Sequence, residues 1–159
     1  MVIAMAKKKV GAAVIRATRL IKKWEGFMPE AYLCPAGVPT IGYGSTRYEN
    51  GDEVAMDDCN IDRDRGEEIL VHFVKKVSAQ VKKVVKNELE PHQMAALISF
   101  TYNVGIGNLM RSTLLQLINR GPENQNIPNE FRRWNKSNGK VLAGLTARRE
   151  DEAKLWCNA

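Results

Sequence analysis

The segment WEGFMPEAYLCPAGVPTIGYG, residues 24–44, marks a change from a helical pattern to a pattern of strands and turns. Before it, residues 10–24 place their apolar side chains on one face at helical spacing, which predicts an amphipathic helix. From Gly26 to Cys59 the chain contains five glycines and three prolines. We therefore expect a small antiparallel sheet there, with Val38–Tyr43 as one strand and Tyr48–Val54, interrupted by a tight turn, as another.

The rest of the chain is predicted to be helical. A long apolar stripe runs from about residue 63 to 86, with acidic residues at its start and lysines at its end, which suits the helix dipole. Pro91 begins another helix, which Gly105 ends. Shorter helices are expected from about Ser112 to Gly121 and from Thr146 to Trp156, and a loop at Pro122–Pro128 leads to Glu130–Trp134. The sequence thus predicts one α+β domain, residues 1–159, with a first helix at about 10–25, a small β lobe at about 26–60, a connecting helix at about 63–86 and a helical lobe at about 88–157.

Composition and charge narrow the possible partners. The content of 44% hydrophobic and 26% charged residues is ordinary for a globular protein, and no apolar run approaches the ~18 residues of a membrane span. The apolar stretch between Lys9 and Arg16 is too short for an export signal, so we expect synthesis in a cytoplasm and no stable membrane insertion. The net charge of +6 favours a polyanionic partner, but no nucleic-acid-binding signature accompanies it.

No cofactor or metal is expected. The three cysteines are widely spaced, and the two histidines, His72 and His92, fall in different predicted helices. The segment Asp58–Asp64 imitates a calcium-binding loop, but Arg63 stands where that loop needs glycine and Ile69 where it needs glutamate.

Glu25 is the first candidate for chemistry. It ends the first predicted helix beside Trp24 and Phe27, where partial desolvation would favour the protonated form. A protonated carboxyl is what the departing oxygen of a glycoside requires. Taken alone, however, Glu25 is better explained as a surface glutamate at a helix end, because isolated carboxylates in loops are common.

The spacing Glu25-x8-Cys34-x5-Thr40 closely resembles the catalytic E-x8-D/C-x5-T pattern of the phage-type lysozymes, the muramidases of glycoside hydrolase family 24 that bacteriophages use as endolysins. The resemblance extends from about Thr18 to Trp156. Its further motifs are L-x-x-x-Q-x-x-A-L at Leu89–Leu97, F-x-x-N-x-G at Phe100–Gly105, S-T-L-L at Ser112–Leu115, L-I-N at Leu117–Asn119, Trp134, and G-L-x-x-R-R-x-x-E-x-x-L at Gly144–Leu155.

The resemblance implies a lysozyme-like fold and hydrolysis of the β-1,4 bond between N-acetylmuramic acid and N-acetylglucosamine in peptidoglycan. It implies that Glu25 is the general acid and that Thr40 helps to hold the attacking water. Tyr102, Asn103 and Thr113 fall where family members line or support the substrate groove. Arg148 falls near the basic residue that pairs with the acid, and Arg149 is the alternative.

The family also implies a monomer that lyses the host cell: an enzyme held in the host cytoplasm, which acts on the periplasmic cell wall after release. Two other functions stay open from the sequence. A lytic transglycosylase needs only the acid, and a non-catalytic peptidoglycan-binding module needs no intact site at all.

Cys34 departs from most relatives, which have aspartate there, although a subset carries cysteine followed by P-A-G as in this chain. A thiolate could activate water, giving the inversion that the family implies, or attack the sugar directly, giving retention. The alternative is a cysteine that only packs in a loop. A disulfide from Cys34 to Cys59 or Cys157 would switch the site off under oxidation. Ser45 is a second departure, since many members have histidine there.

Overall fold

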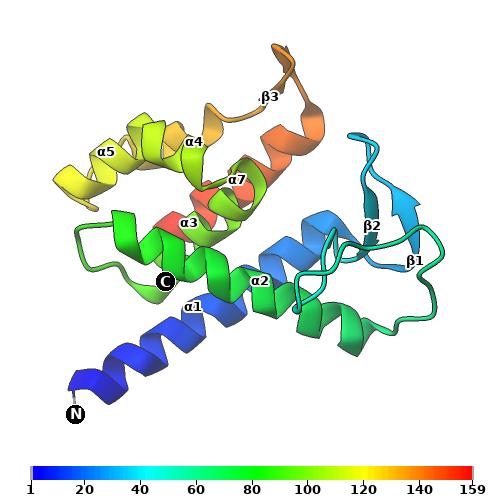
Figure 1. Ribbon diagram of the computed structural model, residues 1–159. Coiled ribbons are helices and arrows are strands. Elements are labelled where there is room, and N and C mark those ends of the chain that lie inside the picture. The colour runs from blue at the N-terminus through cyan, green and yellow to red at the C-terminus, as the bar shows by residue number, and fades with distance from the viewer. Residues whose placement is uncertain (1, 159) are drawn as a thin grey trace. The chain divides into compact units, whose positions relative to one another are not determined.

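The computed structural model describes residues 2–158, with side chains from residue 11 onward (Figure 1). The chain forms two compact units, one of residues 18–76 and one of residues 1–17 with 77–159. Helix α1 (Val2–Glu25) and helix α2 (Arg63–Val84) each contribute to both units. In the described part of the chain, no helix is both long enough and apolar enough to cross a bilayer.

The unit of residues 18–76 combines the end of α1, a two-stranded sheet and the start of α2. Ile21, Ile41 and Leu70 are fully buried and bring one apolar side chain from each of these parts into its core. Across the two helices, Lys22 Nζ lies 2.6 Å from Glu67 Oε2. These contacts hold the C-terminal end of α1, and with it Glu25, beside the sheet.

The sheet is a hairpin of β1 (Met28–Leu33) and β2 (Pro39–Gly42). Gly37 N donates to Cys34 O at 2.8 Å, and Cys34 N donates to Val38 O at 3.1 Å. Gly37 has φ +76°, so the loop is a turn followed by a left-handed glycine, a common three-residue hairpin connection. This loop sets the register that places Tyr32 opposite Thr40.

The prediction for this sheet was partly wrong. The strand expected at Val38–Tyr43 is β2, but its partner is β1 rather than Tyr48–Val54. The latter segment forms a turn closed by a single bridge between Arg47 and Glu53. Strand β1 was missed because it is largely exposed, lacks a clean alternation and contains a proline, which an edge strand tolerates.

Helix α1 also begins at Val2 rather than near residue 10. The prediction started where the apolar stripe starts, whereas the alanine, methionine and lysine residues before it have high helix propensity without a stripe. The long helix predicted at 63–86 is α2, and it ends at Val84.

The second unit is built around α3 (Pro91–Val104), which packs against α7 (Ala143–Cys157). Eight consecutive α3 residues, Met94–Thr101, are buried, so helices cover it on several sides. Helix α4 (Ile106–Arg111) packs on α3, and the Phe131 ring of α6 (Ile127–Arg132) lies 5.5 Å from that of Phe100 (Figure 1). Helix α5 (Thr113–Arg120) packs against α4 and α6. Helix α4 was not predicted, and α7 begins three residues before the expected Thr146.

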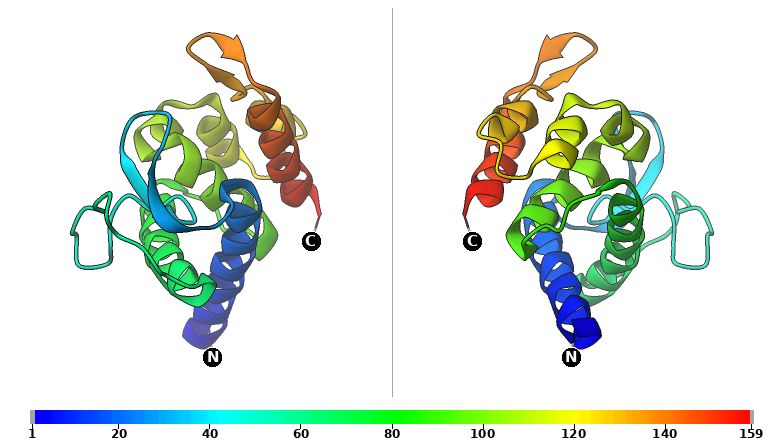
Figure 2. Two further views of the ribbon diagram at one scale, coloured as in Figure 1. Left: turned by 90° about the vertical axis from the view of Figure 1, so that its right-hand side faces the viewer. Right: turned by 90° about the vertical axis from the view of Figure 1, so that its left-hand side faces the viewer.

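A short hairpin of β3 (Lys136–Ser137) and β4 (Lys140–Val141) projects from this unit (Figure 2). Its turn is the Asn138-Gly139 pair, with φ values of +49° and +76°. Two positive φ values are the signature of a type I′ turn, which asparagine and glycine adopt most readily. The tight turn predicted at this pair is therefore confirmed.

Buried charges lie between α3 and α7. Glu152 accepts a hydrogen bond from Ser99 Oγ at 2.9 Å and from the Arg149 guanidinium at 3.0 Å. Arg148 Nε lies 3.7 Å from the same carboxylate, and the Arg149 guanidinium stacks on the Phe100 ring. Burial raises the pKa of Glu152 to about 7, although both arginines act to lower it.

Replacing Glu152 with alanine should destabilise the protein strongly, because it leaves two guanidiniums in the core without their shared carboxylate. Breaking a buried ion pair from one side costs about 3–5 kcal/mol. The free energy of unfolding can be measured by urea denaturation. Glu150→Ala is the matched control on the same helix, since Glu150 pairs with Arg132 at the surface and should leave the midpoint nearly unchanged. Equal effects of the two substitutions would contradict this account of the core.

Candidate active site

Glu25 is the last residue of α1 and is partly exposed. The chain turns sharply after it: Gly26 has φ +68°, and its N–H donates to Lys22 O at 3.2 Å. The chain therefore leaves the helix directly after Glu25 and enters the hairpin at Met28.

Gly44 defines one wall of the site. A Cβ atom on Gly44 would lie only 2.7 Å from Glu25 Oε2 and 3.2 Å from its carboxyl carbon. Gly44 also has φ +77°, within a tight turn that pairs Ile41 with Ser45 through hydrogen bonds of 2.9 and 3.0 Å. The carboxylate of Glu25 thus lies against the backbone of Gly44. A side chain at position 44 would fit only if the carboxylate moved away.

Cys34 follows directly after β1 and is half-buried. The backbone of Val38, then that of Ala36 and the Thr40 hydroxyl, favour the thiolate by hydrogen bonding and lower the pKa of the Cys34 thiol. An aspartate at the start of a turn commonly accepts from the N–H two residues on. The Cys34 sulfur takes that acceptor position relative to Ala36, so the loop gives a thiol the hydrogen bonds that an aspartate would accept there.

Thr40 is buried, and its hydroxyl donates to Val38 O at 2.9 Å. A hydroxyl has a single proton, so its hydrogen bond to Cys34 competes with the one to Val38. Thr40 and Cys34 lie diagonally across the hairpin, since the direct partner of Thr40 is Tyr32, and their side chains form one polar pair.

Tyr32 is a further residue of this site that the sequence did not reveal. It precedes Cys34 by two residues and pairs with Thr40, so the three side chains share one face of the sheet. Burial first, then the charges of Glu25 and Cys34, raise the pKa of the Tyr32 phenol. Its phenol therefore stays protonated near both groups and can donate a hydrogen bond. The two-residue spacing to Cys34 was the available signal, but it becomes informative only once the strand is known.

The structure brings Glu25, Cys34 and Thr40 together in the unit of residues 18–76. The other predicted residues belong to the second unit. Tyr102 and Asn103 lie near the end of α3, half-buried and exposed respectively, and Thr113 is exposed at the start of α5. Arg148 and Arg149 are both buried in the ion-pair cluster around Glu152.

All three cysteines, Cys34, Cys59 and Cys157, are free thiols, so the hypothesised disulfide is not formed in this structure. Ser45 is buried, and its hydroxyl has no hydrogen-bond partner among the described residues. Within residues 2–158, no group of three or more histidine, cysteine or acidic side chains has the arrangement of a metal site.

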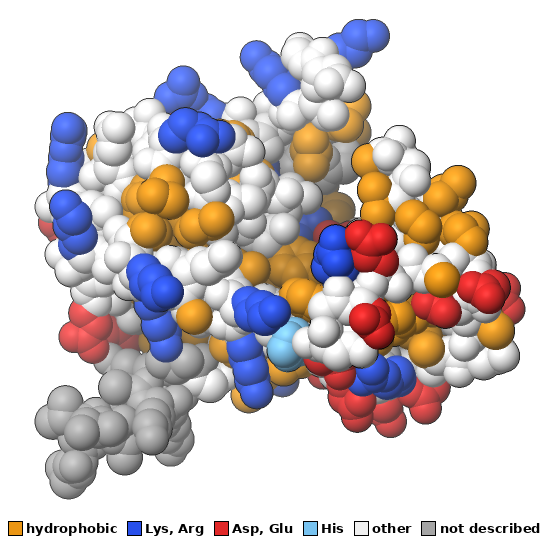
Figure 3. Space-filling model, viewed as in Figure 1, with side chains coloured by type: hydrophobic (Ala, Val, Ile, Leu, Met, Phe, Trp, Pro, Cys, Tyr) orange, Lys and Arg blue, Asp and Glu red, His pale blue; other side chains and the backbone are white. Residues whose placement is uncertain are grey.

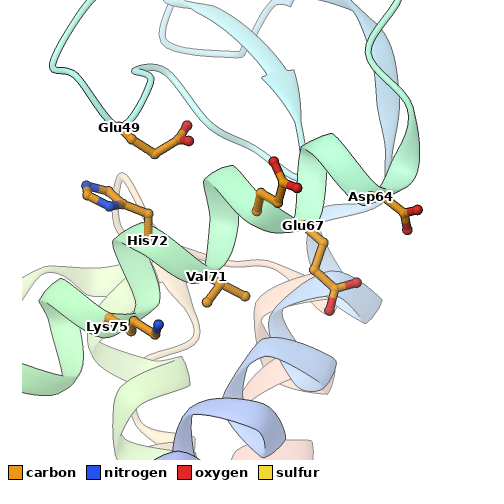
Figure 4. A pocket seen from close by; sticks show the side chains of 7 residues that line it. Glu49, Asp64, Glu67, Val71, His72 and Lys75 are labelled. Carbon is orange, nitrogen blue, oxygen red and sulfur yellow. The ribbon is translucent and has the colours of Figure 1, made fainter.

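An acidic pocket of about 730 Å³ lies elsewhere in the same unit, on one side of α2 (Figure 4). Glu49 and His72 lie beside each other at one end of it, and the Arg65 guanidinium binds Glu49 at 2.7 Å and lowers the pKa of that carboxyl. The pocket does not include Glu25, Cys34 or Thr40. Its lining residues are Glu49, Asp64, Glu67, Glu68, Val71, His72 and Lys75.

The α+β fold, with a small sheet after the first helix and a helical unit at the C-terminal end, is that of the lysozyme-like class of proteins. The chain belongs to the phage lysozyme family, whose model, described as Phage lysozyme, matches residues 22–152. This finding confirms the resemblance seen in the sequence motifs.

Individual relatives agree with this assignment. The endolysin of Bacillus phage B103 is 42% identical over 139 residues, which are 86% of this chain and 51% of that protein. The chain thus spans about half the length of that relative. The endolysin of the Escherichia coli O157:H7 phage FAHEc1 is similar in structure, with a TM-score of 0.82, 34% identity and coverage of 90% and 91% of the two chains. The muramidase domain of SpmX from Asticaccaulis excentricus has a TM-score of 0.77, 27% identity and coverage of 90% and 95%.

The hydrogen bonds around Cys34 predict an unusually acidic thiol. Alkylation of Cys34 by iodoacetamide, followed by mass spectrometry across a pH series, should have its midpoint at lower pH in the folded protein than in urea. Thr40→Val should move the folded midpoint upward, because it removes one donor to the thiolate. Since the unfolded thiol holds its proton to higher pH, the free energy of unfolding should rise between the two midpoints. Identical midpoints in folded and unfolded protein would contradict the assigned role of the hairpin loop.

Proposed function

We propose that this protein is an endolysin muramidase, which hydrolyses the β-1,4 bond between N-acetylmuramic acid and N-acetylglucosamine in bacterial peptidoglycan. The observation that carries the proposal is the grouping of Glu25, Cys34 and Thr40 in one small unit, at the spacing that the phage-type lysozymes use. The relatives named endolysin and the structural neighbour named as a muramidase domain support it.

In the proposed reaction, Glu25 donates its proton to the glycosidic oxygen as the bond from that oxygen to the anomeric carbon breaks. Thr40 and Cys34 hold a water molecule on the opposite face of the sugar. The water attacks the anomeric carbon and gives one proton to the Cys34 thiolate. This sequence inverts the anomeric configuration, whereas direct attack by Cys34 sulfur would form a covalent thioglycoside and end in retention.

Tyr32 has a supporting role in this mechanism. Its protonated phenol lies near the charges of both Glu25 and Cys34 and can donate to the attacking water or to the thiolate. Burying such a donor beside two acidic groups is a way to stabilise negative charge without adding a formal positive charge.

The residues of the second unit enter the proposal through the family resemblance. Tyr102, Asn103 and Thr113 would line or support the groove that holds the glycan. Arg148, with Arg149 as the alternative, would pair with the general acid. We further propose a monomer that is kept in the host cytoplasm and acts on the periplasmic cell wall after release.

Mass spectrometry of the fragments released from purified peptidoglycan tests the reaction. The wild type should release fragments with reducing N-acetylmuramic ends. Glu25→Gln should lower the rate by about 10²–10⁴-fold, the usual contribution of a general acid. Cys34→Ala should be strongly impaired, and Cys34→Asp, which restores the residue of most relatives, should retain activity.

Other products would point to other functions. Ends in the 1,6-anhydro form would identify a lytic transglycosylase, and binding without any fragments would identify a non-catalytic module. Unchanged activity of Cys34→Ala would leave Glu25 as the acid but remove Cys34 from the mechanism.

Gly44→Ala should reduce the rate of fragment release because the new methyl group displaces the Glu25 carboxylate. A shift of about 1 Å in a catalytic group can cost on the order of 10²-fold in rate. Gly51→Ala is the matched control: Gly51 also has a positive φ, of +92°, but nothing lies within 4 Å of a Cβ added there. Both variants carry similar backbone strain, so a loss specific to Gly44→Ala, measured on folded protein, isolates the contact with Glu25. Equal losses of rate in Gly44→Ala and Gly51→Ala would contradict this explanation.

A further inference from the structure

The charge of the second unit is unusual. Residues 1–17 and 77–159 contain 16 Lys and Arg against 7 Asp and Glu, a formal charge of +9, whereas residues 18–76 contain 8 against 11, a charge of −3. In Figure 3, blue side chains are spread over the visible face of the helical unit, including the hairpin at the top of the view. A net charge this high on about 100 residues attracts anionic polymers.

The positive charge has a local centre. The segment 131–149 contains six Lys and Arg and no acidic residue. Its four arginines are in ion pairs with Glu130, Glu150 and Glu152. Its two lysines, Lys136 and Lys140, are exposed and make no ion pair within the part of the chain whose side chains are described. They are therefore the cations of this segment that can serve a partner.

Both lysines stand on the β3–β4 hairpin, which contributes nothing to the core. Every residue from 136 to 144 is exposed, including Val141 at 60% and Leu142 at 44% of their full surface. The base of the hairpin is nevertheless fixed, since Leu142 N donates to Asn135 O at 2.9 Å and Asn135 Nδ2 donates to Thr146 Oγ1 at 3.2 Å. An isolated two-stranded hairpin is only marginally stable in water, so these bonds at the base support it. Its lysines and the apolar side chains of Val141 and Leu142 are thus held together on one exposed element, where a partner can reach them.

The register of the hairpin indicates the shape of that partner. Lys136 pairs with Val141, and Ser137 pairs with Lys140. Cross-strand partners share a face of the sheet, so the two lysines lie on opposite faces. A flat membrane would meet only one face, whereas a branched polymer can engage both.

We propose that the β3–β4 hairpin is a docking element for the peptide stems of peptidoglycan, with Lys136 and Lys140 binding their carboxylates and Val141 and Leu142 contacting their alanine methyl groups. The proposal rests on the function proposed above and adds the part of the polymer that is recognised. The stems combine carboxylates and methyl groups on short flexible branches, which matches the alternation of lysine and apolar side chains on the hairpin.

The test measures binding separately from cleavage. In a Glu25→Gln background, pelleting with purified sacculi at low ionic strength gives a dissociation constant. Lys136→Gln with Lys140→Gln should weaken binding about five- to tenfold, with a smaller effect at high salt. The control pair Lys82→Gln with Lys83→Gln removes the same charge from exposed positions on α2 and should change binding less than twofold. Thermal unfolding of all variants verifies that the fold is retained.

Chemically modified sacculi identify the recognised group. Sacculi whose carboxyls have been converted to amides should bind wild-type and hairpin variants equally. Equal losses for the hairpin pair and the control pair would overturn the proposal, because only total charge would then matter. Loss of binding to phosphatidylglycerol vesicles but not to sacculi would also overturn it, in favour of a membrane contact. Release of muramic reducing ends by the wild type from the same sacculi reports on the proposed function independently.

Discussion

The three-residue loop Pro35–Gly37 is the constraint on which the candidate site depends. By closing the hairpin between Cys34 and Val38, it sets the register that places Tyr32 opposite Thr40. The same loop directs backbone donors at the Cys34 sulfur and thereby lowers the pKa of the thiol. A loop one residue longer or shorter would shift the register and turn Tyr32 and Thr40 to opposite faces. Position and reactivity of the thiol thus come from one local structure.

Glu25 reaches this hairpin because three features act on the end of α1. The ion pair of Lys22 with Glu67 holds the helix against α2, Gly26 permits the sharp turn, and Gly44 leaves room for the carboxylate. None of the three is a reacting group. Each restricts where the carboxyl oxygens can lie, as the proton donation proposed for Glu25 requires.

The sequence predicted the α+β class and the main helices, because these depend on periodicity and on glycine and proline. It also proposed Glu25, Cys34 and Thr40 as one site from their fixed spacing, and all three lie in the unit of residues 18–76. It did not predict β1, whose exposed face leaves no apolar alternation to detect. Tyr32 was not predicted because only the pairing of β1 with β2 brings it close to Thr40. The cluster of Ser99 and Glu152 joins residues 53 positions apart, and no local pattern reveals such a contact. Long-range polar contacts are thus where sequence patterns stop being informative.

The sulfur atom at position 34 has a consequence that is independent of the reaction proposed for it. A carboxylate at that place is a hard ligand, indifferent to peroxide, silver or mercury ions and to alkylating agents. A thiol of lowered pKa is a soft nucleophile and reacts with all of them. Oxidants, soft metal ions and alkylating agents can therefore modify this site, whereas an aspartate at the same position would not react with them. The same property opens the site to covalent labelling by thiol reagents.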